Sequence, residues 1–162
     1  MPMPDIKTIL YTTPLGQHTR PVFRYAVQLA HQLQARVIML HVIEPMGEMG
    51  HALLHTYLPE DTIRKMRDEG TGRVLEQMQA RLEKYRNEEL KALGRDFDFE
   101  LEPMVAEGQH AETILAQAEA LGADIIIMGK ENHFGHHSAT THQVARQAKI
   151  PVLVVPTGKE YI

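Results

Sequence analysis

Short runs of apolar residues recur along the chain and alternate with stretches of helical periodicity. Continuous apolar runs predict buried strands at 6–11, 37–42, 123–130 and 150–156. A further strand is predicted within 97–105, where the alternating opening FDFELE places it at an edge of the sheet. Apolar residues at helical spacing predict helices near 20–34, 60–93, 111–121 and 139–149, with 45–59 as a loop. Thr19 is expected to cap the first helix, and Gly70 and Gly72 would allow a break in the second.

This order of elements predicts a single α/β domain over residues 1–162. Alternating strands and helices at this spacing need a five-stranded parallel doubly wound sheet with helices on both faces. The expected strand order is 3-2-1-4-5, so the topological switch lies between strands 1 and 4. The loops Thr12–Gly16 and Gly129–Thr141 should then meet at one crevice, where such sheets bind ligands.

Composition narrows the classes of partner. The chain has 162 residues, 43% of them hydrophobic, with a formal net charge of −4 and no cysteine. A mildly acidic domain without a basic block is not expected to bind nucleic acid. The sequence has neither a signal peptide at its start nor an apolar run long enough for a membrane span, so we expect a cytoplasmic protein without membrane attachment.

Several segments together resemble the universal stress protein family. They are ILYTTPLGQHTRPVFRYAVQLA, ARVIMLHVIEP, VAEGQHAETILAQAEALGADIIIMGK and VARQAKIPVLVVPTG. The resemblance implies a fold of the adenine nucleotide alpha hydrolase-like type and a role in the stress response. It also implies a homodimer, in which the last strand, Val152–Val155, pairs across the two-fold axis, and an interaction with a protein partner that the sequence does not identify.

Nucleotide-binding members of that family carry G-x2-G-x9-G-[S/T] after strand 4 and an Asp after strand 1. Glycines let the backbone approach phosphates, and the last pair starts a helix whose N–H groups face the anion. Here Gly129 matches the first glycine, Asn132 replaces the second, and Ser138 and Ala139 stand at the last two positions. Pro14 takes the place of the Asp, and the loop is shorter than in the family.

These departures predict a degenerate nucleotide crevice, in a protein that acts by binding and interaction rather than by turnover. Val42 matches the position whose backbone touches adenine. An ATP- or AMP-binding sensor is the alternative, with slow hydrolysis or autophosphorylation left open. The residues expected to line the crevice are Thr12, Thr13, Pro14, Val42, Met128, Gly129, Lys130, Asn132, Ser138, Ala139 and Thr140.

Ten histidines raise a second alternative, a metal-responsive module. Four of them, His133, His136, His137 and His142, fall in and just after the loop that follows strand 4. Imidazole suits zinc, nickel or copper, but no cysteine or H-E-x-x-H pattern accompanies them, so a solvated loop is preferred. Contact of protonated histidines and Lys130 with an anion is a third alternative. His41, inside an apolar strand, is expected to be hydrogen-bonded in the core or at the crevice rim. No catalytic set is predicted.

Overall fold

The computed structural model contains one five-stranded parallel sheet. It describes residues 3–14, 19–44, 48–94, 96–130 and 137–157. The strands are β1 (Thr8–Thr12), β2 (Arg36–Ile43), β3 (Leu101–Glu107), β4 (Ile125–Gly129) and β5 (Val152–Val155). Their order is β3-β2-β1-β4-β5, which confirms both the predicted order and the edge position of the third strand.

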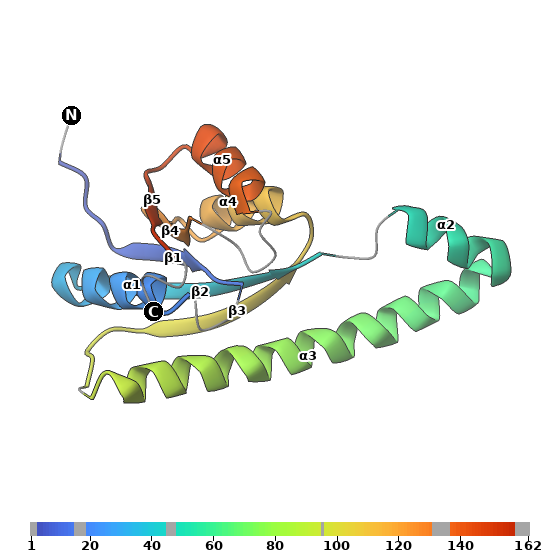
Figure 1. Ribbon diagram of the computed structural model, residues 1–162, viewed down its shortest axis with the longest axis horizontal. Coiled ribbons are helices and arrows are strands. Elements are labelled where there is room, and N and C mark those ends of the chain that lie inside the picture. Colours follow the sequence, from blue (N-terminus) through green and yellow to red (C-terminus); the bar gives the residue numbers. More distant parts are fainter. Residues whose placement is uncertain (1–2, 15–18, 45–47, 95, 131–136, 158–162) are drawn as a thin grey trace.

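Helices cover both faces of this sheet (Figure 1). One face carries α1 (Arg20–Leu33) and the carboxyl-terminal half of α3 (Glu60–Ala92), and the other carries α4 (His110–Ala120) and α5 (His137–Gln147). Successive residues of each strand point to opposite faces of the sheet, so they contribute to two separate hydrophobic cores. Tyr11 and Met39 pack with α1 and with Leu82 of α3, whereas Leu10 and Leu40 pack with α4 and with Val144 of α5. The double coverage explains why β1 and β2 read as continuous apolar runs.

The start of α1 differs from the sequence prediction. Thr19 occupies the N-cap position, but its side chain makes no capping hydrogen bond. Its hydroxyl instead lies 3.0 Å from the hydroxyl of Tyr85 on α3. Thr19 is nearly fully buried, so its hydroxyl serves a contact between helices rather than the end of its own helix.

The segment predicted as a loop between β2 and α3 contains a helix, α2 (Glu48–Tyr57), so that prediction was wrong. This helix contacts α3. The possible break at Gly70 and Gly72 does not occur, since α3 runs unbroken over 33 residues. Two interior glycines cost about 1 kcal/mol each, and strong helix formers on both sides outweigh that cost.

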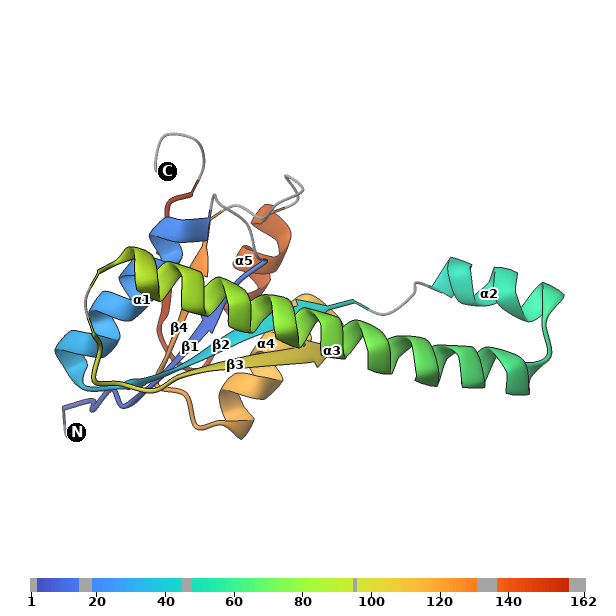
Figure 2. The same ribbon diagram turned by 90° about the horizontal axis from the view of Figure 1, so that it is seen from below.

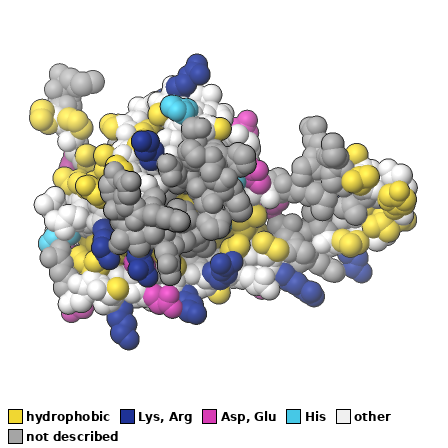
Figure 3. All heavy atoms as spheres, in the orientation of Figure 1, with side chains coloured by type: hydrophobic (Ala, Val, Ile, Leu, Met, Phe, Trp, Pro, Cys, Tyr) yellow, Lys and Arg dark blue, Asp and Glu magenta, His cyan; other side chains and the backbone are white. Residues whose placement is uncertain are grey.

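The amino-terminal half of α3 and all of α2 extend beyond the sheet as a helical arm, here defined as residues 48–75 (Figure 2). Among the side chains of the arm that the structure describes, four large hydrophobic ones are exposed, at Leu53, Tyr57, Met66 and Val74. Hydrophobic side chains are also visible over the arm in Figure 3. Leu82, where α3 crosses the sheet, is by contrast fully buried.

The carboxyl-terminal half of α3 covers the outer edge of β3. Glu100 and Gly108 bond to β2, so by alternation the backbone groups of Leu101, Pro103 and Val105 point outward. Arg86 of α3 donates to the carbonyl of Leu101 at 3.3 Å. Gln79 of α3 donates to the carbonyl of Pro103 at 3.2 Å, and Pro103 has no N–H to offer. Helix side chains thus take the place of a sixth strand.

No helix in the described part of the chain is long and apolar enough to cross a lipid bilayer.

Candidate functional site

The first and fourth strands lie side by side, as predicted. β1 pairs with β4 through Ile9–Ile125, Leu10–Ile126 and Tyr11–Ile127. The chain after β1 returns through α1 to β2 on one side, and the chain after β4 returns through α5 to β5 on the other. This is the topological switch point of a doubly wound sheet, where ligands bind at the carboxyl ends of the strands. We call it the switch point.

The β1 side of the switch point is held by backbone bonds. Thr12 and Thr13 are buried, and Pro14 after them is exposed. The N–H of Thr13 donates to the carbonyl of Leu40 at 2.9 Å. Its own carbonyl accepts from Nδ1 of His41 at 2.7 Å. His41 is therefore hydrogen-bonded, and burial is the main cause of the lowering of its pKa below the usual value of 6.5. The ring is neutral near pH 7, with Nε2 unprotonated.

The β4 side joins the strand to the start of α5. Met128 is buried, and the backbone N–H of exposed Lys130 donates to the carbonyl of Val155 at 2.9 Å. Thr141 of α5 donates its hydroxyl to the carbonyl of Gly129 at 3.3 Å, a link that the sequence analysis did not foresee. This bond joins the second turn of α5 to the end of β4, so the amino terminus of the helix lies near that end, and its free N–H groups favour an anion.

The other predicted lining residues lie around this point where the structure describes them. Val42 is buried near the end of β2. Ser138 falls in the first turn of α5, one residue inside the helix rather than ahead of it. Ala139 is exposed and Thr140 half-buried. Asn132 lies outside the described residues, and its role stays a prediction.

Two of the candidate metal ligands, His133 and His136, also lie outside the described residues. His137 begins α5, and His142 is exposed on that helix. Among the described residues no group of three or more His, Asp and Glu side chains converges as a metal site would require. The metal-responsive alternative stays a prediction.

Comparison with known proteins identifies the family and supports the fold. A profile of the universal stress protein family matches residues 5–156. The chain belongs to this family. No functionally curated protein matches the sequence significantly. The solved structure of MJ0577 matches this universal stress protein with a TM-score of 0.72 and 22% identity, over 96% of this chain and 99% of the other.

Two further solved structures carry ligands. A universal stress protein in complex with cAMP matches with a TM-score of 0.61 and 18% identity, over 95% of this chain and 99% of the other. A universal stress protein from Archaeoglobus fulgidus in complex with dAMP matches with a TM-score of 0.54 and 15% identity, over 94% and 99%. At these identities the comparison shows a shared fold.

Below the switch point, a buried polar cluster joins α3 to the ends of β1 and α1 in this universal stress protein. Burial raises the pKa of the Tyr11 phenol well above 10 and also raises that of Tyr85. The Phe23 ring meets each of the two tyrosine rings edge-on. Beside them, Nε of Arg20 donates to Oε1 of Glu89 at 3.0 Å. One signal of this cluster is visible in the sequence, the polar Glu89 beside apolar positions of α3.

A second polar pair stands at the carboxyl ends of β2 and β3. Nδ1 of His110 lies 2.7 Å from Oε1 of Glu44, and this hydrogen bond lowers the pKa of the Glu44 carboxyl. His110 begins α4, whose N-cap is Gln109, with its side-chain oxygen accepting from the N–H of Glu112 at 2.7 Å. Glu112 places a negative charge in the first turn of α4, where the helix dipole stabilises it.

Proposed function

We propose that this universal stress protein takes part in the stress response by binding an adenine mononucleotide at the switch point, without turning it over. The observation that carries the proposal is the position of the amino terminus of α5. It lies near the end of β4, which is beside β1, and the bond from Thr141 to Gly129 joins the helix to that end. A helix amino terminus at that place suits one phosphate group.

The sequence supports one phosphate rather than three. Pro14 cannot accept the hydrogen bonds that a carboxylate would, and Ala139 has no hydroxyl. Each lost hydrogen bond to a charged group weakens binding by about 1.5–3 kcal/mol, or one to two decades in affinity. Several such losses would weaken ATP more than AMP, since only a triphosphate uses the whole cradle.

The ligands of two related structures support the same class of molecule. Both cAMP and dAMP contain adenine and a single phosphate, and the proteins that hold them share this fold. For this chain, the buried Val42 offers its backbone to the base and the exposed Lys130 offers a positive charge to the phosphate.

A homodimer in the cytoplasm is part of the proposal. Pro151 and Val155 bond to β4, so by alternation Val152 and Val154 direct their backbone groups to the open edge of the sheet. An exposed edge strand of apolar residues can pair with another chain, and a second copy of β5 around a two-fold axis would cover it in this way.

Calorimetry on the full chain tests the ligand, with AMP and ATP–Mg²⁺ titrated separately and acid extraction used to detect any co-purified nucleotide. We expect AMP to bind more tightly than ATP. Lys130→Met should weaken AMP binding, whereas Lys149→Met, which removes an exposed lysine from the opposite end of the sheet, should not. ATP binding as tightly as AMP would disprove the reduced cradle. No heat of binding with either ligand at millimolar concentration would disprove the nucleotide proposal.

A further inference from the structure

A cavity of about 620 Å³ lies at the other end of the sheet, away from the switch point. It forms where α3 ends, the chain turns at Gly94, and residues 96–101 lead into β3. Its volume falls within the range of clefts that hold small ligands, roughly 300–1,000 Å³. The edge strand β3 and β5 lie on opposite sides of the sheet, so a dimer through β5 would leave the cavity free.

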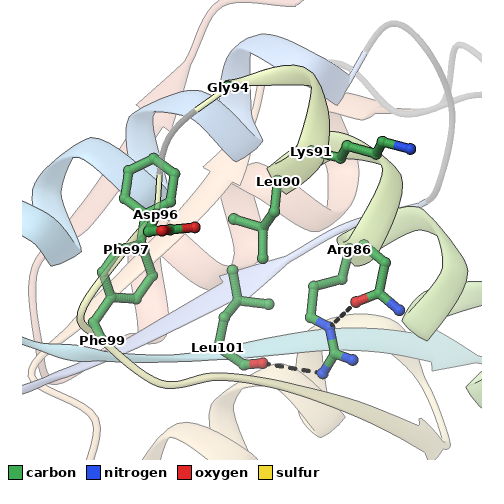
Figure 4. Close-up of a pocket in the computed structure, with 9 residues that line it drawn as sticks. Arg86, Leu90, Lys91, Gly94, Asp96, Phe97, Phe99 and Leu101 are labelled. Atoms are coloured by element: carbon green, nitrogen blue, oxygen red, sulfur yellow. Dashed lines mark hydrogen bonds between the residues drawn. The ribbon is translucent and has the colours of Figure 1, made fainter.

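Hydrophobic side chains form much of the lining. Phe97, Phe99, Leu90 and Leu101 all line the cavity, and all four are only half-buried. The two phenylalanine rings are 5.4 Å apart and tilted by 56°. Figure 4 shows them on one side of the cavity, with Leu90 and Leu101 between them and Arg86. Apolar surface is therefore still available here for an aromatic or aliphatic body.

A fixed guanidinium stands opposite the rings. Nε of Arg86 donates to the side-chain oxygen of Asn87 at 3.1 Å, and Nη1 donates to the carbonyl of Leu101 at 3.3 Å. Both acceptors are neutral, and among the described residues no carboxylate forms an ion pair with Arg86. An arginine oriented in this way keeps its charge and its remaining N–H groups for an anion.

The other charged groups of the lining favour the same sign of ligand. Lys91 also lines the cavity, although in Figure 4 its amine points away from the other lining residues. It therefore makes the electrostatic potential more positive without contacting a ligand directly. Asp96 is the one acidic side chain among the described lining residues. Among the described lining residues, two cationic groups and one carboxylate leave a formal charge of +1 beside the hydrophobic side chains.

We propose that this cavity is a second binding site, which takes a small aromatic anion such as a carboxylate or sulfonate. The ring system packs against Phe97 and Phe99, and the acid group receives hydrogen bonds from Arg86. Asp96 opposes the ligand's charge and lowers the affinity. The site is independent of the nucleotide proposal, because none of the lining residues belongs to the switch point.

The full chain can be titrated with 8-anilinonaphthalene-1-sulfonate, an aromatic sulfonate, using fluorescence and calorimetry at low ionic strength. We expect one saturable site per chain. Arg86→Met keeps the apolar stem but removes the guanidinium, and should weaken binding by about tenfold or more. Arg81→Met is the matched control, since Arg81 is an exposed arginine of the same helix outside the cavity, and should bind as the parent does.

Asp96→Asn removes the opposing charge without touching a hydrogen bond of Arg86, and should tighten binding severalfold. It keeps the test decisive if Arg86→Met fails to fold. Equal affinities of Arg86→Met and Arg81→Met, or an unchanged affinity of Asp96→Asn, would overturn the proposal. So would binding at many weak sites that Arg86→Met leaves unaltered, because the probe would then report the exposed hydrophobic side chains of the arm. AMP should not displace the probe, and displacement would refute a separate site.

Discussion

The ion pair between Arg20 and Glu89 gives the sharpest test of how α3 is attached to the body. Arg20 is the first residue of α1 and Glu89 lies near the end of α3, so the pair joins the two helices of one face. The Glu89 side chain is 9% exposed and that of Arg20 is 40% exposed, with Nε and Oε1 3.0 Å apart. Substituting Arg20→Met would leave a carboxylate buried without its cation.

The magnitude follows from these exposures. Breaking a fully buried ion pair by removing one partner costs roughly 3–5 kcal/mol. Water reaches the Arg20 side of this pair, which reduces that cost. A cation at a helix amino terminus is itself unfavourable by roughly 0.3–1 kcal/mol, so removing Arg20 offsets a further part of the cost of breaking the ion pair. We expect Arg20→Met to lower the free energy of unfolding by about 2 kcal/mol. The double variant Arg20→Met with Glu89→Met should recover most of this loss, because no buried charge remains.

Urea unfolding followed by far-UV circular dichroism measures these differences. Arg24→Met is the matched control, since Arg24 is an exposed arginine one turn further along α1, and its substitution should cost under about 0.5 kcal/mol. The reasoning fails if Arg20→Met is no less stable than Arg24→Met. It fails equally if the double variant is as unstable as the single one, because the loss would then come from packing rather than from an unpaired charge.

Three further predictions concern pH, backbone conformation and assembly. Because the folded state lowers the pKa of His41 below 6.5, the unfolded chain binds a proton first as the pH falls. The contribution of His41 to stability is complete above pH 6.5 and is lost as the pH falls below it, so His41→Gln should flatten the fall in unfolding free energy below pH 6.5. Gly108 has a φ of +154°, and an added Cβ would collide with the Thr113 hydroxyl, so Gly108→Ala should lower the melting temperature by several degrees. Val154→Pro removes an outward N–H at the open edge and should convert the proposed dimer to a monomer in sedimentation, with the fold kept.

Each of these has a clear contrary result. An unaltered pH profile in His41→Gln would mean that other groups cause the decline. A melting temperature equal to that of the parent in Gly108→Ala would show that the α4 end relaxes at little cost. A dimer that survives Val154→Pro would place the interface elsewhere.

The sheet was predictable from the sequence because each buried strand is marked locally. The run from Ile125 to Met128 is apolar over its whole length and ends at a glycine, so both its class and its end were visible. Gly122 likewise marked the end of α4, and it adopts a φ of +63° just past the helix. The order of strands then followed from handedness rules that need no knowledge of side-chain contacts.

Features that depend on distant partners were not predictable in the same way. Thr19 carries a good capping residue type, and only the presence of Tyr85, 66 positions away, turns its hydroxyl elsewhere. The helix α2 was missed because Pro45, Gly47, Gly50 and Pro59 favour a loop, and its contact with α3 is not visible in the sequence. The bond from Thr141 to Gly129 depends on how α5 packs on β4, which local periodicity does not determine. The predicted site residues that the structure describes lie near the ends of the strands and at the start of α5, and their contacts with a ligand are still predictions.

The cover that α3 lays over β3 limits how this protein can grow by adding strands. The carbonyls of Leu101 and Pro103 already accept hydrogen bonds from Arg86 and Gln79, so an incoming strand would find fewer acceptors on that side. If the protein pairs through β5, as proposed above, the outer edges of the combined sheet would therefore be the two β3 strands beneath α3. A molecule with two open edges could add copies without end and form fibres, whereas such a pair would stop at two copies.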